Sequence, residues 1–166
     1  MATKSGNKGR YICKVGFYDI YAKDTLKPKK ESKFKWLKGE VKSTEYVVYH
    51  SKKAISAGVD GLILVCNGAG GHTGDLSPFA FVSEVRNIFD GTIIVGGSIS
   101  SGESILAIQA LGADLAYMGT RFINTKESKA PEEYCNMIIE AGASDIVYTA
   151  AVSGVPANFL GPSLQA

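Results

Sequence analysis

The chain has 166 residues, of which 45% are apolar and 20% charged, and this composition is ordinary for one globular domain with its own core. Its apolar runs are far shorter than the roughly 18 residues of a membrane-spanning helix, and its polar first residues contain no signal-peptide core. These features argue against a membrane protein and predict a cytoplasmic location. Three widely spaced cysteines and two histidines indicate neither a disulfide framework nor a metal site.

Charge divides the chain into two parts. Residues 1–44 hold 12 Lys and Arg against 4 Asp and Glu, a balance of +8, whereas residues 45–166 hold 6 against 12, a balance of −6. In the basic part, Phe34 and Trp36 stand among lysines, an arrangement that can bind nucleic acid through phosphate contacts and base stacking. No nucleic-acid motif accompanies it, so we expect a solvated face or an arm and no nucleic-acid partner.

The predicted elements become regular from Thr44 onward. Thr44 can cap a helix that runs to Gly58, which supplies the helix stop. The next run, VDGLILVC, is almost continuously apolar, which is typical of a parallel strand covered on both faces. Farther along, GTIIVGG predicts a second buried strand, GESILAIQALG a helix ending at Gly112, and ADLAYMG a third strand.

Repetition of this order predicts β/α units and a parallel sheet. A helix-stop glycine followed by aspartate and an apolar run occurs at Gly58, Gly112 and Gly142, so the residues after Gly142 are expected to form another such strand. The spacing fits both a TIM barrel and a doubly wound sheet. The position of the glycines favours the barrel, because they follow the carboxyl ends of the strands, where TIM barrels bind their ligands. The strand-end glycines are Gly68, Gly70, Gly71, Gly96, Gly97 and Gly119.

Two of the strand-end turns offer donors for a phosphate group. At Gly96 and Gly97 the backbone amides are unhindered by side chains, and serine hydroxyls follow. The segment YMGTRF adds the amides of Gly119 and Thr120, the Thr120 hydroxyl, and Arg121 as a nearby cation. Because the two turns follow adjacent strands, they predict one shared phosphate site. Arg121 fits an ordinary structural ion pair equally well.

His72 is the candidate catalytic residue. It lies in CNGAGGHTG, and a glycine-rich loop at a strand end rarely buries an imidazole in a core. An imidazole at this place can accept a proton, donate a hydrogen bond or stabilise an anionic substrate near neutral pH. Cys66 adjoins the loop and is a candidate for ligand contact, whereas His50 is expected to be a surface or packing residue. The absence of GxGxxG, GxxxxGK[ST] and GxSxG argues against Rossmann, P-loop and serine-hydrolase chemistry.

Between about Val41 and Leu164 the chain resembles the second half of the FMN-dependent nitronate monooxygenases, once called 2-nitropropane dioxygenases. The strings AGGHTG, GGSISSGESILAIQALGADLAYMGTRF and GVPANFL carry the resemblance. It implies a TIM barrel that holds FMN noncovalently, with the flavin phosphate on the last two strand-end loops. It also implies oxidation of alkyl nitronates by dioxygen, the flavin taking an electron from the anionic nitronate. Carried over by position, the catalytic residue is His72, and the cofactor-binding residues are Gly70, Gly71, Gly96, Gly97, Met118, Gly119, Thr120 and Arg121.

Two departures from the family pattern shape our expectations. Many members carry a glutamine on the strand before the AGGH loop, where this chain has Val65, Cys66 and Asn67. Family members are also considerably longer, and their first half has no counterpart in residues 1–40. We therefore predict a basic leader of unassigned structure over 1–40, followed over 41–166 by the C-terminal half of an FMN-binding β/α barrel.

Half a barrel leaves two open strand edges and one uncovered sheet face. A strand from the leader segment RYICKVGFYDIYA, or a second copy of the chain in a homo-oligomer, is expected to cover them. Two alternatives to the nitronate monooxygenase hypothesis stay open. One is an FMN-dependent enoyl-thioester reductase, whose family shares the AGGH and GTRF loops. The other is a noncatalytic barrel fragment whose basic leader binds an acidic partner.

Overall fold

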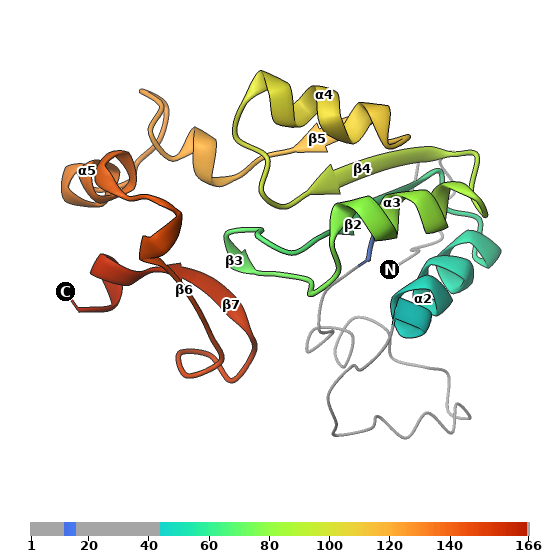
Figure 1. Ribbon diagram of the computed structural model, residues 1–166, viewed down its shortest axis with the longest axis horizontal. Helices are drawn as coiled ribbons and strands as arrows, with labels where there is room; N and C mark the ends of the chain where they lie inside the picture. Colours follow the sequence, from blue (N-terminus) through green and yellow to red (C-terminus); the bar gives the residue numbers. More distant parts are fainter. Residues whose placement is uncertain (1–11, 16–43, 166) are drawn as a thin grey trace, which may run out of the picture.

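The computed structural model describes residues 12–15 and 44–165, so most of the predicted leader lies outside the described residues (Figure 1). Among the residues described, no helix has the length and apolar character required to cross a membrane. The elements in chain order are β1 (Ile12–Val15), α2 (Thr44–Ser56), β2 (Gly61–Val65), β3 (Gly71–His72), α3 (Pro78–Arg86), β4 (Thr92–Gly96), α4 (Gly102–Ala110), β5 (Leu115–Tyr117), η1 (Thr120–Phe122), α5 (Glu132–Glu140), η2 (Ala143–Asp145), β6 (Ile146–Thr149), β7 (Ala157–Leu160) and η3 (Gly161–Leu164).

Four parallel strands form the main sheet, in the order β1-β2-β4-β5. The helices and strands that the sequence predicts over 44–119 are confirmed, and Gly58 after α2 has a φ of +79°, the left-handed conformation expected at a helix stop. The leader does contribute a strand, since β1 pairs in parallel with β2. Within the described residues the sheet does not close on itself, so the fold is a partial barrel of TIM-barrel β/α units.

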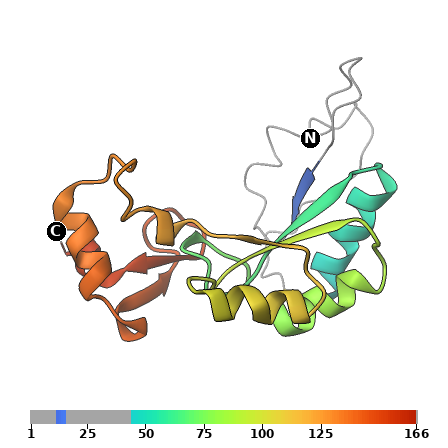
Figure 2. The same ribbon diagram turned by 90° about the horizontal axis from the view of Figure 1, so that it is seen from above.

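Helices α2, α3 and α4 cover one face of this sheet (Figure 2). That face carries Leu62 and Leu64 of β2 and Ile93 and Val95 of β4, which are all fully buried. The helices add Ala54, Phe81, Val82, Val85 and Ile108 to the same core. Burial of each large apolar side chain stabilises the fold by about 1.5–3 kcal/mol. The helical layer therefore holds the strand ends in place.

The two capped helices α3 and α4 begin at serines. Ser77 Oγ accepts a hydrogen bond from the Phe79 N–H at 3.3 Å, and proline occupies the first turn of α3, where its missing N–H costs nothing. At α4, Ser101 and Ser104 form a reciprocal capping box. Both helices start just after the glycine-rich loops, so these caps fix where each loop ends.

The opposite face of the main sheet is the one that lines the interior of a β/α barrel. The register aligns Ile63, Ile94 and Leu115 in one row, and side chains in register point to the same side. In a closed barrel such rows fill the interior as layers. Here Leu115 and Tyr117 of β5 are each 54% exposed, and β5 has no outer neighbour among the described strands. The predicted open edge is therefore found at β5.

The strand after Gly142 forms, but the expectation that it belongs to the parallel set is wrong. β6 pairs antiparallel with β7 in a separate sheet of order β3-β7-β6. Only seven residues, 150–156, connect β6 to β7, and a parallel crossover needs a dozen or more. Together with α5, these strands form a second part of the molecule, toward which the carboxyl ends of β2, β4 and β5 point (Figure 1).

Arg86 at the end of α3 ties together the amino-terminal end of the main sheet. Its Nε donates to the Gly112 carbonyl at 2.8 Å, and its Nη1 donates to the carbonyls of Phe89 at 3.1 Å and Gly91 at 2.9 Å. Its Nη2 lies 2.6 Å from Asp114 Oδ2 in a salt bridge. One guanidinium thus donates hydrogen bonds to the carbonyls that precede β4 and to one that precedes β5.

Asp114 completes this network. Its Oδ2 also accepts the Ile93 N–H at 2.8 Å. This hydrogen bond, followed by the Arg86 guanidinium, holds the pKa of Asp114 below the usual value for aspartate. Because the folded-state pKa is lowered, the ionised carboxylate contributes stability above the pKa of an unfolded aspartate. That contribution is lost as the pH falls through the lowered pKa.

Replacing Arg86 by alanine is expected to lower the free energy of unfolding by about 2 kcal/mol, because three carbonyls and one carboxylate lose their donor. Arg121→Ala is the matched control, since Arg121 is exposed and has no ion pair or side-chain hydrogen bond with other described residues. The control should stay within about 0.5 kcal/mol of the parent. Urea unfolding of the three proteins measures both values, and equal losses in the two variants would contradict the role given to Arg86.

Candidate functional site

The carboxyl ends of β2, β4 and β5 meet at one edge of the main sheet. Val65, Gly96 and Tyr117 form the last row of the sheet, because Val65 pairs with Gly96 and Gly96 with Tyr117. A Cβ on Gly96 would lie 3.4 Å from the Tyr117 carbonyl oxygen, so this buried glycine belongs to the floor beneath the loops. The three predicted site loops therefore start side by side.

The loop after β4 packs against the loop after β2. A Cβ on Gly97 would lie 2.7 Å from the Cys66 carbonyl oxygen and 2.8 Å from that of Asn67, closer than real Cβ atoms approach. Its φ of +127° also favours glycine. A methyl group on Gly68 would overlap Ser98 Oγ, and the Ser98 N–H donates to the Gly68 carbonyl at 3.1 Å. A side chain at Gly68 or Gly97 therefore does not fit between these two loops.

Ser98 has a φ of +54°, a conformation uncommon for a residue with a side chain. It costs roughly 1–2 kcal/mol. Two hydrogen bonds hold it there, from its N–H to the Gly68 carbonyl and from its Oγ to the Asn67 carbonyl at 3.4 Å. Backbone strain of this kind gathers at functional sites. The turn at Gly97 and Ser98 is therefore fixed by its neighbour loop.

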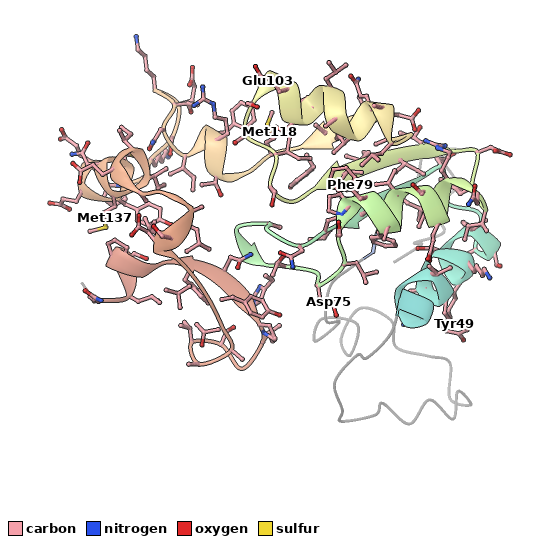
Figure 3. All side chains as sticks on the ribbon, in the orientation of Figure 1. Tyr49, Asp75, Phe79, Glu103, Met118 and Met137 are labelled. Carbon is pink, nitrogen blue, oxygen red and sulfur yellow. The ribbon has the colours of Figure 1, made fainter. Side chains whose placement is uncertain are left out.

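The loop after β5 joins the same cluster. A Cβ on Gly70 would lie 2.5 Å from Thr120 Oγ1. The loop after β2 thus contacts both the β4 turn and the β5 turn, and it brings the predicted residues Gly70, Gly97 and Thr120 together. Met118 directly follows β5, at the carboxyl end of the sheet (Figure 3). Gly119 and Thr120 begin the short η1 helix, and Arg121 follows them on the surface.

Gly71 and Gly119 differ from the packed glycines. Nothing lies within 4 Å of a Cβ built on either of them. Gly71 has a φ of +74°, which by itself favours glycine, whereas the φ of Gly119 is −113°, a value open to any residue. Neither conformation nor packing among the described residues explains glycine at 119. Glycine at this place leaves the backbone open to the approach of a ligand.

The backbone donors of the β5 turn face no described acceptor. The N–H groups of Gly119 and Thr120 donate no hydrogen bond to the part of the chain that the structure describes, as expected at the first positions of a helical turn. Both residues are exposed. With the Thr120 hydroxyl and the Arg121 guanidinium they form a group of donors suited to an anion.

His72 lies on β3, directly after the glycine loop. Its backbone pairs with Ala157 of β7. Its Nε2 lies 3.3 Å from Ser153 Oγ, and Ser153 Oγ donates to the Val155 carbonyl at 3.3 Å. A hydroxyl that donates to a carbonyl accepts from the imidazole, so this arrangement favours the tautomer with the proton on Nε2. The imidazole is half-buried.

Cys66 is not a ligand contact through its side chain. The thiol is fully buried in the core beneath the helices, and burial raises its pKa to about 12. A thiol with so high a pKa is neutral and unreactive near neutral pH. Only the Cys66 carbonyl takes part in the loop, where it accepts a hydrogen bond from Thr73 Oγ1 at 3.0 Å.

Two residues of this region were not predicted, Ser153 and Asn158. Asn158 Nδ2 donates to the Ala69 carbonyl at 2.9 Å, across 89 residues of sequence. Neither residue sits in a pattern of spacing that indicates chemistry. Contacts of this length are set by the pairing of β3 with β7, which local sequence does not reveal.

These features define a segment of a β/α barrel whose strand-end loops converge on one site. Residues 24–162 match the family model described as nitronate monooxygenase, and the chain belongs to this family. The predicted resemblance is confirmed. The family is one of oxidoreductases and is flavin-dependent in general. The division into 1–40 and 41–166 and the cytoplasmic location stay predictions.

Known proteins similar to this chain have several activities. A probable nitronate monooxygenase of Staphylococcus aureus is 30% identical over 147 residues, which are 82% of this chain and 40% of that protein. An octahydro-indene-carboxyl-CoA dehydrogenase of Rhodococcus jostii is 31% identical over 69% of this chain and 33% of its own length. The solved structure of FabK from Thermotoga maritima has a TM-score of 0.61 at 34% identity, covering 67% of this chain and 36% of that one. The chain thus spans well under half the length of these relatives.

Gly97→Ala is expected to lower the free energy of unfolding by about 2–3 kcal/mol, because the new methyl group meets two carbonyl oxygens at a φ that strains it. The matched control is Gly102→Ala, where nothing lies within 4 Å of the added Cβ. The control should change stability by less than about 1 kcal/mol, in the stabilising direction. Urea unfolding compares them, and a neutral Gly97→Ala would contradict the tight contact between the loops.

Proposed function

We propose that this chain binds FMN at the carboxyl ends of β2, β4 and β5 and serves the oxidation of alkyl nitronates by dioxygen. One observation carries the proposal. The loop after β2 contacts the loops after β4 and β5, and the glycine at position 119 faces open space without a conformational reason to be glycine. Together with membership of a flavin-dependent family, this supports a ligand that lies against the loop backbone.

The β5 turn suits the phosphate of FMN. The amides of Gly119 and Thr120, the Thr120 hydroxyl and the Arg121 guanidinium supply donors and one positive charge to a dianion. Arg121 has no ion pair within the described residues, which favours this role over a structural one. The neighbouring turn at Gly97 is proposed to complete the cradle from the β4 side.

The glycine loop suits the flat ring of the flavin. Gly70 and Gly71 are both exposed, and Gly71 has open space where a Cβ would be. A ring system can therefore approach the backbone at Gly71 without meeting a side chain, whereas Thr120 Oγ1 occupies the Cβ direction of Gly70. Met118, half-buried after β5, is proposed to lie beside it.

His72 is proposed to face the substrate. A bound flavin would supply the redox chemistry between the nitronate and dioxygen. The role of the imidazole is to donate its Nε2–H to the anionic nitronate, in exchange for Ser153 Oγ, and so to orient the carbon of the nitronate toward the flavin ring. The hydrogen bond to Ser153 limits rotation of the imidazole, so the ring is already oriented when the substrate arrives.

A second activity has one specific observation in its favour. A relative of this chain is named a dehydrogenase of a carboxyl-CoA thioester. An FMN-dependent enoyl-thioester reductase would use the same phosphate and ring sites with a nicotinamide donor. The two proposals share the flavin and differ in the substrate.

Three measurements on the purified chain separate these proposals. The first is a titration with FMN, followed by flavin absorbance and fluorescence. Oxygen uptake with propionate 3-nitronate then tests the nitronate activity, and oxidation of reduced nicotinamide with an enoyl thioester tests the reductase. A chain that shows no change of flavin absorbance or fluorescence in the titration would contradict both enzymes and favour the noncatalytic fragment.

Gly119→Ala is expected to weaken FMN binding about tenfold to hundredfold without loss of stability, because a methyl group enters the space proposed for the ligand at a cost of about 1–3 kcal/mol. Gly142→Ala is the matched control, since Gly142 is also exposed, has a φ of −103° and has no atom closer than 3.8 Å to an added Cβ. Fluorescence titration gives the dissociation constants. Equal affinities of the two variants would remove the β5 turn from the site.

His72→Ala is expected to lower kcat/KM for the nitronate by about 10²-fold or more, since positioned hydrogen-bonding and proton-transfer groups contribute about that much. The FMN dissociation constant should change less than about threefold, because the proposed contacts of the imidazole are with the substrate. Steady-state oxygen uptake and FMN titration are measured on the same preparations. Unchanged turnover would exclude His72 from the reaction.

A further inference from the structure

The carbonyl oxygens of residues 66–69, the first part of the glycine loop, all accept hydrogen bonds from other parts of the protein. Each of the four carbonyls of 66–69 accepts a hydrogen bond from a residue outside this stretch. The donors in chain order are Thr73 Oγ1 at 3.0 Å, Ser98 Oγ at 3.4 Å, the Ser98 N–H at 3.1 Å and Asn158 Nδ2 at 2.9 Å. These four hydrogen bonds fix the backbone path of 66–69.

Asn158 differs from the other donors because it belongs to the second sheet. Thr73 follows the loop directly, and Ser98 lies in the turn after the neighbouring strand β4. Asn158 lies on β7, the central strand of the small antiparallel sheet. Its side chain donates a hydrogen bond to the Ala69 carbonyl, and its backbone pairs with Gly71, so this one residue contacts the loop at two points.

The backbone pairing alone is too short to fix β3. It consists of two residue pairs and one isolated bridge between Gly70 and Asn158, and short antiparallel pairs are only marginally stable in water. The amide of Asn158 adds a hydrogen bond of 2.9 Å in a half-buried place, where loss of the donor leaves a carbonyl unsatisfied.

Asn158 contacts the part of the loop that belongs to the proposed site. The Ala69 carbonyl accepts the hydrogen bond from Asn158, and Ala69 directly precedes Gly70. Gly70 in turn contacts Thr120 of the β5 turn. His72 follows two residues later and meets Ser153, in the connection between β6 and β7. The hairpin thus sets the distance between the candidate imidazole and the β5 turn.

We propose that Asn158 is a positioning residue. It acts through the Ala69 carbonyl to hold Gly70 and His72 in their positions relative to the β5 turn at Thr120. Its consequence for catalysis rests on the proposed function, whereas its action on the loop does not. Aspartate is the sharpest replacement. It keeps the shape of asparagine but turns the donor into an acceptor that repels the Ala69 carbonyl.

The first test uses the chain without flavin. Amide hydrogen exchange over 68–72 in Asn158→Asp is expected to be about tenfold faster than in the parent, which corresponds to about 1.4 kcal/mol of local protection. Exchange in β2 and β4 should be unchanged. The NMR signal of the His72 imidazole should also shift, because Nε2 loses its fixed place beside Ser153. The matched control is Asn136→Asp, at an exposed position of α5, where neither signal should change.

The second test uses FMN and the nitronate. Asn158→Asp should bind FMN about tenfold more weakly than Asn136→Asp and should lower kcat more than it raises KM. Unchanged exchange over 68–72 would overturn the proposal, and so would a uniform rise of exchange across the whole chain, since that indicates a purely structural role. If the parent itself binds no FMN, the proposed function fails, and the exchange and imidazole signals still decide whether Asn158 positions the loop.

Discussion

The site depends on the contact between the loops after β2 and β4, at the end of one row of the parallel sheet. Val65 and Gly96 are in register, so the residues that follow them must pass each other at the distance between neighbouring strands. At that distance Gly97 lies against the carbonyl oxygens of Cys66 and Asn67, and even a methyl group does not fit. This contact brings the main chains of the two loops together, with only the Ser98 side chain bridging them.

The glycines of these loops serve different purposes, and structure is needed to separate them. At 68, 70 and 97 the neighbouring loop fills the space of the missing side chain, so these residues are needed for packing. At 71 the backbone conformation favours glycine, and at 119 neither reason applies. Counting glycines in the sequence therefore overstates the number that a ligand must contact, and Gly119 carries the strongest indication of one.

Local sequence sufficed for α2, β2, β4, α4 and β5 and for the end of the sheet where the candidate site lies, because burial patterns and helix stops act over a few residues. It did not predict α3 or the short strand β3. The same local signals misassigned β6. Its stop glycine, aspartate and apolar run match those of the parallel strands, but its direction is set by the short connection to β7. Asn158 was missed for a related reason, since its contact with Ala69 exists only because β7 pairs with β3. The roles of His72 and of the phosphate donors stay predictions.

The two ends of the main sheet differ in how their polar backbone groups are satisfied. At the amino end, Arg86 donates hydrogen bonds to carbonyls that precede β4 and β5 and forms a salt bridge with Asp114. The protein's own side chains therefore satisfy the polar backbone groups of that end. At the carboxyl end, the amides of Gly119 and Thr120 are exposed and lack an acceptor in the described chain. A parallel sheet makes this division available because all its strands present the same end to the same edge. We therefore expect substitutions at Arg86 to act on folding and substitutions in the exposed turn after β5 to act on the proposed ligand binding.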